Sequence, residues 1–185
     1  MRVVSGKIKG IRFSPPKGFP SRPTTDFAKE GLFNVLEHRL SLYDLDVLDL
    51  FAGTGNISFE FASREAGNIT SVDQNFKCLR FIDEMAKKHG LDEDITTIKS
   101  EVLYFVERCT TIYDIVFADP PFDYKHYDKL AEKVLAGGLL KEGGLLIIEH
   151  SARVHLEGLP QYVESKKYGN VVFSLFQITE DYEVK

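Results

Sequence analysis

Short apolar runs alternate with segments of helical periodicity from residue 46 onward. Runs typical of buried strands lie at 46–51, 69–73, 95–99, 113–118 and 145–149. The segments between them that fit helices are 56–65, 75–89, part of 101–108 and 126–136. This alternation predicts right-handed βαβ units and a parallel sheet with helices on both faces.

The two ends of the chain depart from this alternation. Residues 162–169 and 170–178 are strand-like and meet at a Gly-Asn pair, which favours a hairpin turn. We therefore expect the sheet to end in antiparallel strands. Residues 2–13 alternate apolar and basic side chains around two glycines, which predicts a short amino-terminal hairpin.

A loop-rich section at 14–25, with four prolines, separates this hairpin from a helix that Thr25 can cap. Apolar side chains of that helix recur at helical spacing, at Leu32, Phe33, Leu36 and Leu40. A chain of 185 residues fits one α/β domain over 1–185. We divide it into a hairpin arm with linker, 1–25, and a body, 26–185.

Composition narrows the class of protein. The two cysteines, Cys78 and Cys109, lack a CxxC or Cys/His spacing, so we expect neither a disulfide framework nor a metal site. No apolar run approaches the roughly 18 residues of a membrane span, and the start lacks the apolar core of a signal peptide. We expect a soluble cytoplasmic monomer without membrane contact.

Charge is unevenly distributed along the chain. The net charge is -5, yet residues 1–29 hold seven basic residues and one acidic residue, a net +6, which leaves -11 for the rest. A basic arm on an acidic body can direct a positive patch at phosphates, although a solvated basic hairpin fits the charge alone. The candidate phosphate contacts are Arg2, Lys7, Lys9, Arg12, Arg22 and Lys29.

A glycine motif follows the first strand of the body. In "DLFAGTGN", at 49–56, Gly53 and Gly55 allow the backbone to approach a ligand before the next helix begins. Asp73 ends the following strand about 20 residues later, where a carboxylate can accept hydrogen bonds from two ribose hydroxyls. These residues therefore predict a cofactor that carries a nucleoside.

Two residues distinguish between cofactors. A dinucleotide fingerprint has a third glycine where this chain has Ser58. Asp49 lies inside the strand before the glycines, and a carboxylate there suits a positively charged cofactor better than a pyrophosphate. We therefore favour S-adenosylmethionine over a nicotinamide cofactor, and the D-x-F-x-G-x-G pattern resembles motif I of Rossmann-like methyltransferases.

In residues 114–124, "DIVFADPPFDY", an apolar strand is followed directly by a stiff proline turn at its carboxyl end. "DPPF" resembles the motif of methyltransferases that modify planar exocyclic amines. The Asp119 carboxylate and the Pro120 carbonyl can each accept an N–H of the amine and return its lone pair to attack, while Pro121 helps to fix the turn. Phe122 can stack on the base.

The chain as a whole resembles the RsmD family of bacterial small-subunit (16S) ribosomal RNA guanine-N2 methyltransferases. The segments that carry the resemblance are "RVVSGKIKGIRF", "RPTTDFAKEGLFNVL", "DLFAGTG", "DIVFADPPF" and "KKYGNVVFSLFQ". The resemblance implies a Rossmann-like class I fold with seven strands, the seventh antiparallel, and S-adenosylmethionine as cofactor. It implies ribosomal RNA as partner, within the small subunit or an assembly intermediate.

The resemblance also extends the set of site residues. It adds Phe51 and Glu101 to the cofactor site, although a surface glutamate at a helix start fits Glu101 equally well. It adds Thr24, within R-P-T-T-D, to the residues that contact substrate. Phe27 departs from the family, whose members often carry an arginine there. His126 and His150 lie near strand ends, and we interpret them as loop residues rather than general bases.

Two other functions stay open at this point. An adenine-N6 methyltransferase of DNA or RNA would use the same motif on a different amine. A non-catalytic RNA-binding assembly factor could retain the fold, although an intact Asp119 and an intact glycine turn argue against that interpretation.

Overall fold

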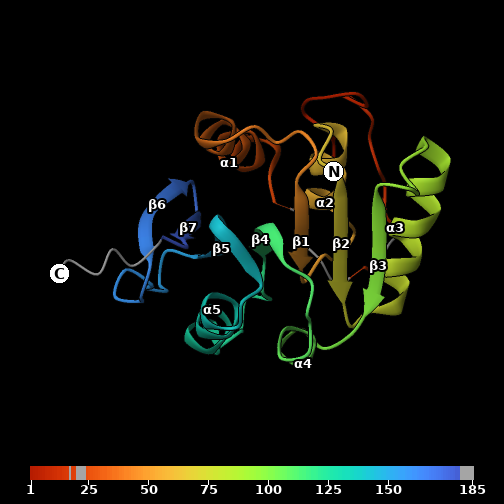
Figure 1. The fold of residues 1–185 in the computed structure, drawn as a ribbon. Coiled ribbons are helices and arrows are strands. Elements are labelled where there is room, and N and C mark those ends of the chain that lie inside the picture. The colour runs from red at the N-terminus through yellow and green to blue at the C-terminus, as the bar shows by residue number, and fades with distance from the viewer. Residues whose placement is uncertain (17, 20–23, 180–185) are drawn as a thin grey trace.

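Seven strands form a single sheet in the computed structural model, which describes residues 1–16, 18–19 and 24–179 (Figure 1). The strands are β1 (Asp46–Leu50), β2 (Asn68–Asp73), β3 (Ile95–Lys99), β4 (Tyr113–Ala118), β5 (Leu140–Ser151), β6 (Tyr162–Tyr168) and β7 (Val171–Gln177). The helices are α1 (Asp26–Arg39), α2 (Asn56–Ser63), α3 (Phe76–His89), α4 (Val102–Val106) and α5 (Tyr127–Ala136).

The strand order is β3-β2-β1-β4-β5-β7-β6. Strands β1 to β5 pair in parallel, and β7 runs antiparallel to both of its neighbours, β5 and β6. The predicted fold class is therefore confirmed. Because the strand order reverses between β1 and β4, the carboxyl ends of these two strands flank a crevice of the kind in which open α/β sheets bind ligands.

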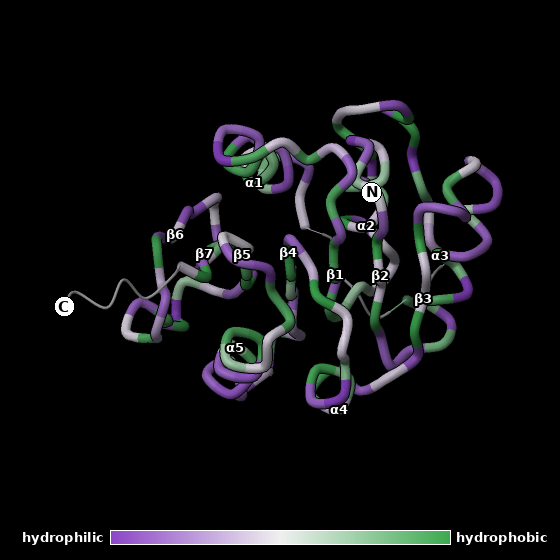
Figure 2. The backbone as a smooth tube through the Cα atoms, viewed as in Figure 1, coloured by the Kyte–Doolittle hydropathy of each residue, from purple (hydrophilic) through white to green (hydrophobic). Residues whose placement is uncertain are grey.

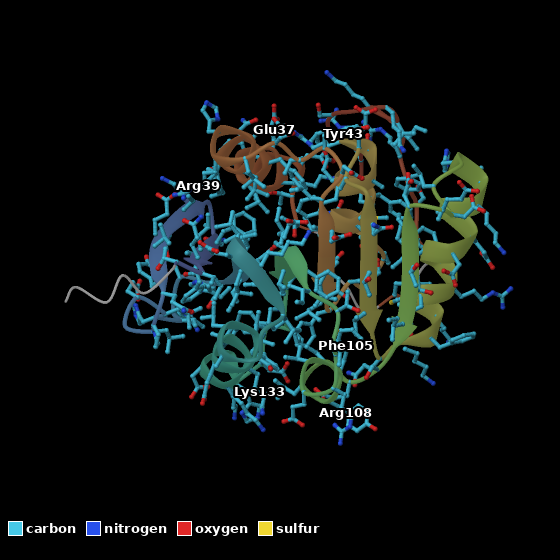
Figure 3. All side chains as sticks on the ribbon, viewed as in Figure 1. Glu37, Arg39, Tyr43, Phe105, Arg108 and Lys133 are labelled. Atoms are coloured by element: carbon cyan, nitrogen blue, oxygen red, sulfur yellow. The ribbon has the colours of Figure 1, made fainter. Side chains whose placement is uncertain are left out.

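Helices cover both faces of the sheet (Figure 1). Side chains of α1, α2, α3 and the amino-terminal arm share one apolar cluster with one face, and those of α4 and α5 share a second cluster with the other. Figure 2 shows the apolar segments concentrated in the strands. Charged side chains such as Arg39, Arg108 and Lys133 lie at the periphery of the molecule (Figure 3).

Local signals set the limits of the helices. The Thr25 hydroxyl accepts the amide hydrogen of Ala28, so α1 begins after it, as its sequence predicts. Asn75 caps α3 in the same way, and Gly90 ends that helix with a left-handed backbone. Within residues 1–16, 18–19 and 24–179, no helix is long and apolar enough to cross a membrane.

The amino-terminal arm pairs with itself and is also held by α2. The predicted hairpin is present: Met1 and Phe13 exchange backbone hydrogen bonds of 3.1 and 3.0 Å, the Val3 amide donates to the Ile11 carbonyl at 3.0 Å, and an antiparallel bridge joins Arg2 and Arg12. Gly6 adopts a positive φ of 83°, and an added Cβ would lie 1.8 Å from the Ser63 carbonyl oxygen, so only glycine fits this approach. The neighbouring Lys7 amide donates to that same carbonyl at 2.7 Å. The arm is therefore fastened to the carboxyl end of α2.

Candidate functional site

The glycine turn after β1 is strained and closely packed. Phe51 has a φ of 60°, a left-handed conformation that a bulky side chain rarely adopts. Gly53 and Gly55 follow with φ of 53° and 78°. A Cβ on Gly55 would lie 2.9 Å from Cγ1 of Ile82. The backbone at Gly55 therefore lies closer to the Ile82 side chain than a residue with a Cβ atom would allow.

Asp73 joins the end of β2 to this turn. One carboxylate oxygen accepts the amide hydrogen of Gly53 at 2.8 Å, and the other accepts that of Asn75 at 2.7 Å. Each oxygen has a second lone pair for another donor. The position therefore fits both a structural role in the turn and the predicted contact with ribose hydroxyls.

Asp49 is buried, at 2% exposure, on the sheet face covered by α2. Its carboxylate accepts a hydrogen bond from the Ser58 hydroxyl, and that hydroxyl also lies 2.8 Å from the Ser71 hydroxyl. Burial raises the pKa of Asp49 to about 7, and the hydrogen bonds of Ser58 oppose the shift. Ser58, the residue that replaces a third glycine, thus orients a buried carboxyl group.

Asp119 lies directly after β4 and beside the glycine turn. Its amide donates to the Leu50 carbonyl at 3.3 Å, which continues the pairing of β4 with β1. Burial raises the pKa of Asp119 well above its usual value, and the charges of Glu149 and Asp49 add to the effect. The carbonyl of Pro121 accepts the Tyr124 amide at 2.9 Å, which closes the proline turn.

Phe122 is the exposed end of this turn. Its side chain is 86% exposed, so it contributes little to the core. The ring is therefore not part of the core and is available to a ligand.

Tyr124 is a residue that sequence reasoning did not identify. Its ring meets the Phe51 ring edge to face, with centroids 5.3 Å apart. Its hydroxyl is buried and has no hydrogen-bond partner among the described residues. Burial raises the pKa of Tyr124 to about 12, and the charge of Glu101 contributes. An orphaned hydroxyl beside the glycine turn fits a bound polar ligand.

A second missed residue is Glu149, which lies next to Asp119 in the sheet. It is 8% exposed, and Oε2 accepts the hydroxyl hydrogen of Thr24 at 2.7 Å. Thr24 and Asp119 line one cavity of about 30 Å³ with Asp49 and the glycine turn. That volume suits reacting groups of methyl or amine size rather than a whole nucleoside.

A larger cavity in the described residues lies elsewhere. It measures about 680 Å³, lies between α1 and β6, and includes none of the predicted site residues. We therefore assign the chemistry to the smaller cavity, where the carboxylates and the glycine turn meet.

Glu101 acts as the cap of α4. Its carboxylate accepts the amide hydrogens of Leu103 at 3.1 Å and Tyr104 at 2.8 Å. Glu101 is therefore the glutamate at a helix start that the sequence also allowed, and its contact with adenine stays a prediction. Neither histidine enters the site. Exposed His126 precedes α5, as a loop residue would, whereas His150 is a buried residue of β5 that contacts the Ser174 hydroxyl, which corrects its interpretation as a loop residue.

The predicted phosphate contacts differ in their availability. Lys9 and Arg12 are exposed and form no ion pair with another described residue. Arg2 pairs with Asp26 at 3.0 Å, and Lys7 pairs with Asp94 at 2.7 Å. Arg22 lies outside the described residues.

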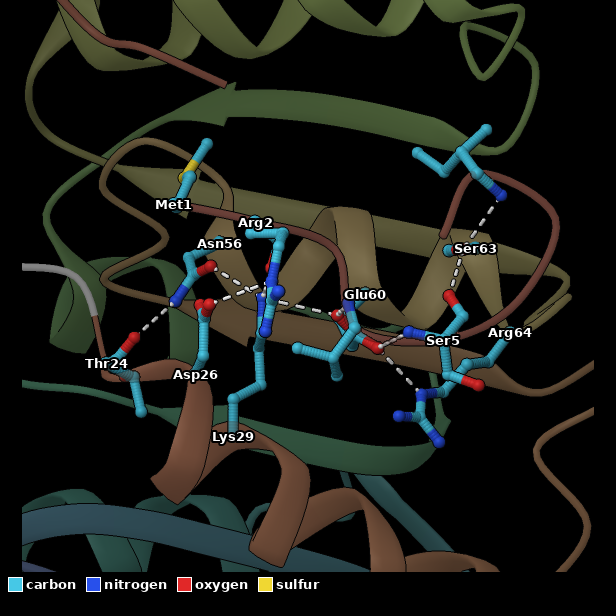
Figure 4. A network of polar contacts seen from close by, with 12 residues as sticks. Met1, Arg2, Ser5, Thr24, Asp26, Lys29, Asn56, Glu60, Ser63 and Arg64 are labelled. Atoms are coloured by element: carbon cyan, nitrogen blue, oxygen red, sulfur yellow. Dashed lines mark hydrogen bonds and ion pairs between the residues drawn. The ribbon is translucent and has the colours of Figure 1, made fainter. Parts of the chain in front are cut away.

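Lys29 requires a correction. It is fully buried and pairs with Glu60 at 3.2 Å, so it cannot reach a phosphate (Figure 4). Its Nζ also donates to the Arg2 carbonyl at 2.6 Å and to Oδ1 of Asn56 at 2.9 Å. The predicted RNA contact is replaced by a structural link between the arm, α1 and α2.

The electrostatics of the site follow from these positions. Within the described ranges, no lysine or arginine pairs with Asp49, Asp73, Asp119 or Glu149. No group of three or more His, Cys, Asp or Glu side chains in the described structure is arranged to hold a metal ion. Carboxylates without cations favour ligands that bring positive charge or N–H donors.

The fold and this site define the class of Rossmann-like methyltransferases. The solved structure of the yhhF protein of Escherichia coli superposes with a TM-score of 0.85 at 24% identity, over 97% of this chain and 98% of that one. TrmN of Thermus thermophilus superposes with a TM-score of 0.64 at 24% identity, over 81% of this chain and 48% of that one.

Sequence comparison identifies the family. The family model described as conserved hypothetical protein 95 matches residues 1–177, and the chain belongs to this family, the RsmD family. The YlbH protein of Bacillus subtilis is 30% identical over 160 residues, 84% of this chain and 85% of that protein. Ribosomal RNA small subunit methyltransferase D of Escherichia coli K12 is 27% identical over 188 residues, 96% of this chain and 89% of that protein. The predicted resemblance is confirmed.

Proposed function

We propose that this protein transfers a methyl group from S-adenosylmethionine to the exocyclic N2 amine of a guanine in small-subunit ribosomal RNA, in the cytoplasm. The observation that carries the proposal is the pair of acceptors after β4. The Asp119 carboxylate and the Pro120 carbonyl receive no hydrogen bond from the described residues. The relative named ribosomal RNA small subunit methyltransferase D supports the RNA substrate.

The residues around the glycine turn fit the cofactor. Asp73 has lone pairs for ribose hydroxyls, and the orphaned Tyr124 hydroxyl offers a donor and an acceptor. Asp49 supplies negative charge without a cationic partner. When bound, S-adenosylmethionine supplies a methyl group activated by a positively charged sulfur.

Two acceptors can make the target amine nucleophilic. The lone pair of an exocyclic amine is delocalised into the ring, so the nitrogen attacks poorly while it stays planar. Hydrogen bonds from its two N–H groups to Asp119 and Pro120 would hold the nitrogen closer to tetrahedral and localise that lone pair. The protein contributes mainly position, and the methylated nitrogen then gives its proton to Asp119 or to water.

Phe122 would hold the base in place. Its exposed ring projects from the same turn as Asp119, where a base removed from its stack can lie on it. Stacking of this kind contributes about 1–3 kcal/mol per base and does not depend on the sequence.

The test is methyl transfer by Asp119→Ala in single-turnover assays with labelled cofactor and small-subunit RNA or particles. We expect transfer to collapse while calorimetry shows cofactor affinity within a few fold of wild type. Asp123→Ala, an exposed carboxylate in the same loop, is the matched control and should keep normal transfer.

Nucleoside mapping of the product identifies the base. N2-methylguanosine is the expected product, and N6-methyladenosine would favour the adenine alternative. A folded Asp119→Ala protein that transfers methyl at the wild-type rate would refute the amine-orienting role of this residue.

A further inference from the structure

Asp119 and Glu149 occupy equivalent places on adjacent parallel strands. Ala118 of β4 pairs with Ile148 of β5, so the next residue along each chain is Asp119 and Glu149. Directly paired residues of a parallel sheet point to the same face, and neighbouring strands lie about 4.8 Å apart. The two carboxyl groups are therefore side by side at the edge where the proposed base binds.

Thr24 fixes the orientation of Glu149. Its hydroxyl donates to Oε2 of Glu149, and its carbonyl accepts Nδ2 of Asn56 at 3.1 Å. Asn56 in turn accepts from buried Lys29 (Figure 4). One oxygen of Glu149 is thus held from the segment that enters α1, and the other receives no donor from the described side chains.

The surroundings of the pair keep it desolvated and without a counterion. The groups that face it are Asp49 from β1, Tyr127 from α5 and the Thr24 hydroxyl. Burial raises the pKa of Glu149 to about 7, while Thr24 opposes the shift. A ligand with adjacent N–H donors would satisfy both carboxylates together.

We propose that Glu149 is a specificity-determining residue whose carboxylate accepts the N1–H of the target guanine while Asp119 accepts an N2–H. This inference rests on the proposed function and adds the reason for guanine. Guanine presents N1–H and N2–H as neighbouring donors on its Watson–Crick edge. Adenine presents its amine beside N1, which has a lone pair and no hydrogen, so Glu149 would face an acceptor.

The discriminating substrate is 2-aminopurine. It carries the same 2-amino group as guanine, but its N1 has a lone pair instead of a hydrogen. The probes are a small-subunit RNA fragment that contains the mapped target guanine and the same fragment with 2-aminopurine at that position. We expect wild-type kcat/KM to favour guanine by at least about a hundredfold, because a site built for an N–H discriminates strongly against an analogue without it.

Glu149→Gln tests the residue itself. The glutamine can present its amide N–H₂ to the N1 lone pair of 2-aminopurine, so the preference for guanine should fall below about tenfold. Glu142→Gln, an exposed change at the other end of β5, should keep the wild-type preference. Thr24→Val removes the hydroxyl that orients Glu149, and it should weaken the preference while cofactor affinity stays unchanged.

The outcomes separate this inference from the function on which it rests. Wild-type enzyme that methylates both probes equally well overturns the inference, whatever the variants do. A folded Glu149→Gln protein that keeps the full preference for guanine overturns it as well. A wild-type product of N6-methyladenosine alone would refute the proposed guanine function and this inference together.

Discussion

Replacement of Lys29 by methionine tests the most unexpected feature of the structure, a lysine buried under the amino-terminal arm. Its ammonium group pairs with Glu60 and donates to the Arg2 carbonyl and the Asn56 side chain. Methionine has a similar length and volume without the charge. The variant therefore removes the polar contacts while leaving most of the packing in place.

The expected loss follows from what remains around Glu60. Removal of one partner of a buried ion pair costs about 3–5 kcal/mol when the other charge is left uncompensated. Here the Glu60 carboxylate still accepts from Arg64 at 2.9 Å and from the amides of Val4 at 2.9 Å and Ser5 at 3.1 Å. We therefore expect Lys29→Met to lose about 3 kcal/mol of unfolding free energy, at the lower end of that range.

Equilibrium unfolding in urea measures this loss. Lys7→Met is the matched control, because Lys7 forms an exposed ion pair with Asp94 that is worth less than about 1 kcal/mol. The two explanations of Lys29 give opposite results. A Lys29→Met protein as stable as the Lys7→Met control, with a weaker salt dependence of RNA binding, would refute the buried network and support the original prediction that Lys29 contacts a phosphate.

Three further predictions concern the site and its surface. Phe122→Ala should lose roughly ten- to a hundredfold in the rate of methyl transfer while its Tm stays unchanged, because the ring is 86% exposed. A lowered Tm would contradict this prediction. Burial raises the pKa of Asp49 from 3.8 to about 7, so the stability contributed by its protonated form is complete below about 3.8 and is lost as pH rises from there through about 7; denaturant titrations should show Asp49→Asn gaining stability relative to wild type between these two pH values. Lys9→Ala with Arg12→Ala should lower the salt slope of RNA binding by about two without changing cofactor affinity, whereas an unchanged slope would exclude these contacts.

The sheet could be predicted because its signal is local. Buried parallel strands appear as apolar runs, and each predicted run from 46–51 to 145–149 falls on an observed strand. The hairpin at 2–13 was predicted from its local pattern, but its attachment to α2 was not. Besides the backbone pairs across the arm, the amides of Val4 and Ser5 donate to the Glu60 carboxylate and that of Ile8 donates to the Ser63 hydroxyl, and such long-range partners leave no trace in a local pattern.

Two buried residues had a sequence signal that could have placed them correctly. Lys29 lies three, four and seven residues before Leu32, Phe33 and Leu36, so helical spacing places it on the apolar face of α1. Glu149 ends an apolar strand as Asp119 does, and the carboxyl ends of parallel strands meet at one edge. The contact of Glu149 with Thr24 joins residues 125 positions apart, which spacing alone cannot reveal.

The unpaired carboxylates at this edge indicate which ligands the site accepts. Burial raises the pKa of Asp49, Asp119 and Glu149, so without a ligand the edge tends to hold protons. A ligand that brings positive charge or N–H donors favours the ionised carboxylates, and its binding is strengthened by that preference. The positively charged sulfur of the cofactor and the adjacent N–H groups of guanine both have this property. The N1 lone pair of adenine does not, because it needs a hydrogen-bond donor, so the ionised form of Glu149 favours guanine over adenine.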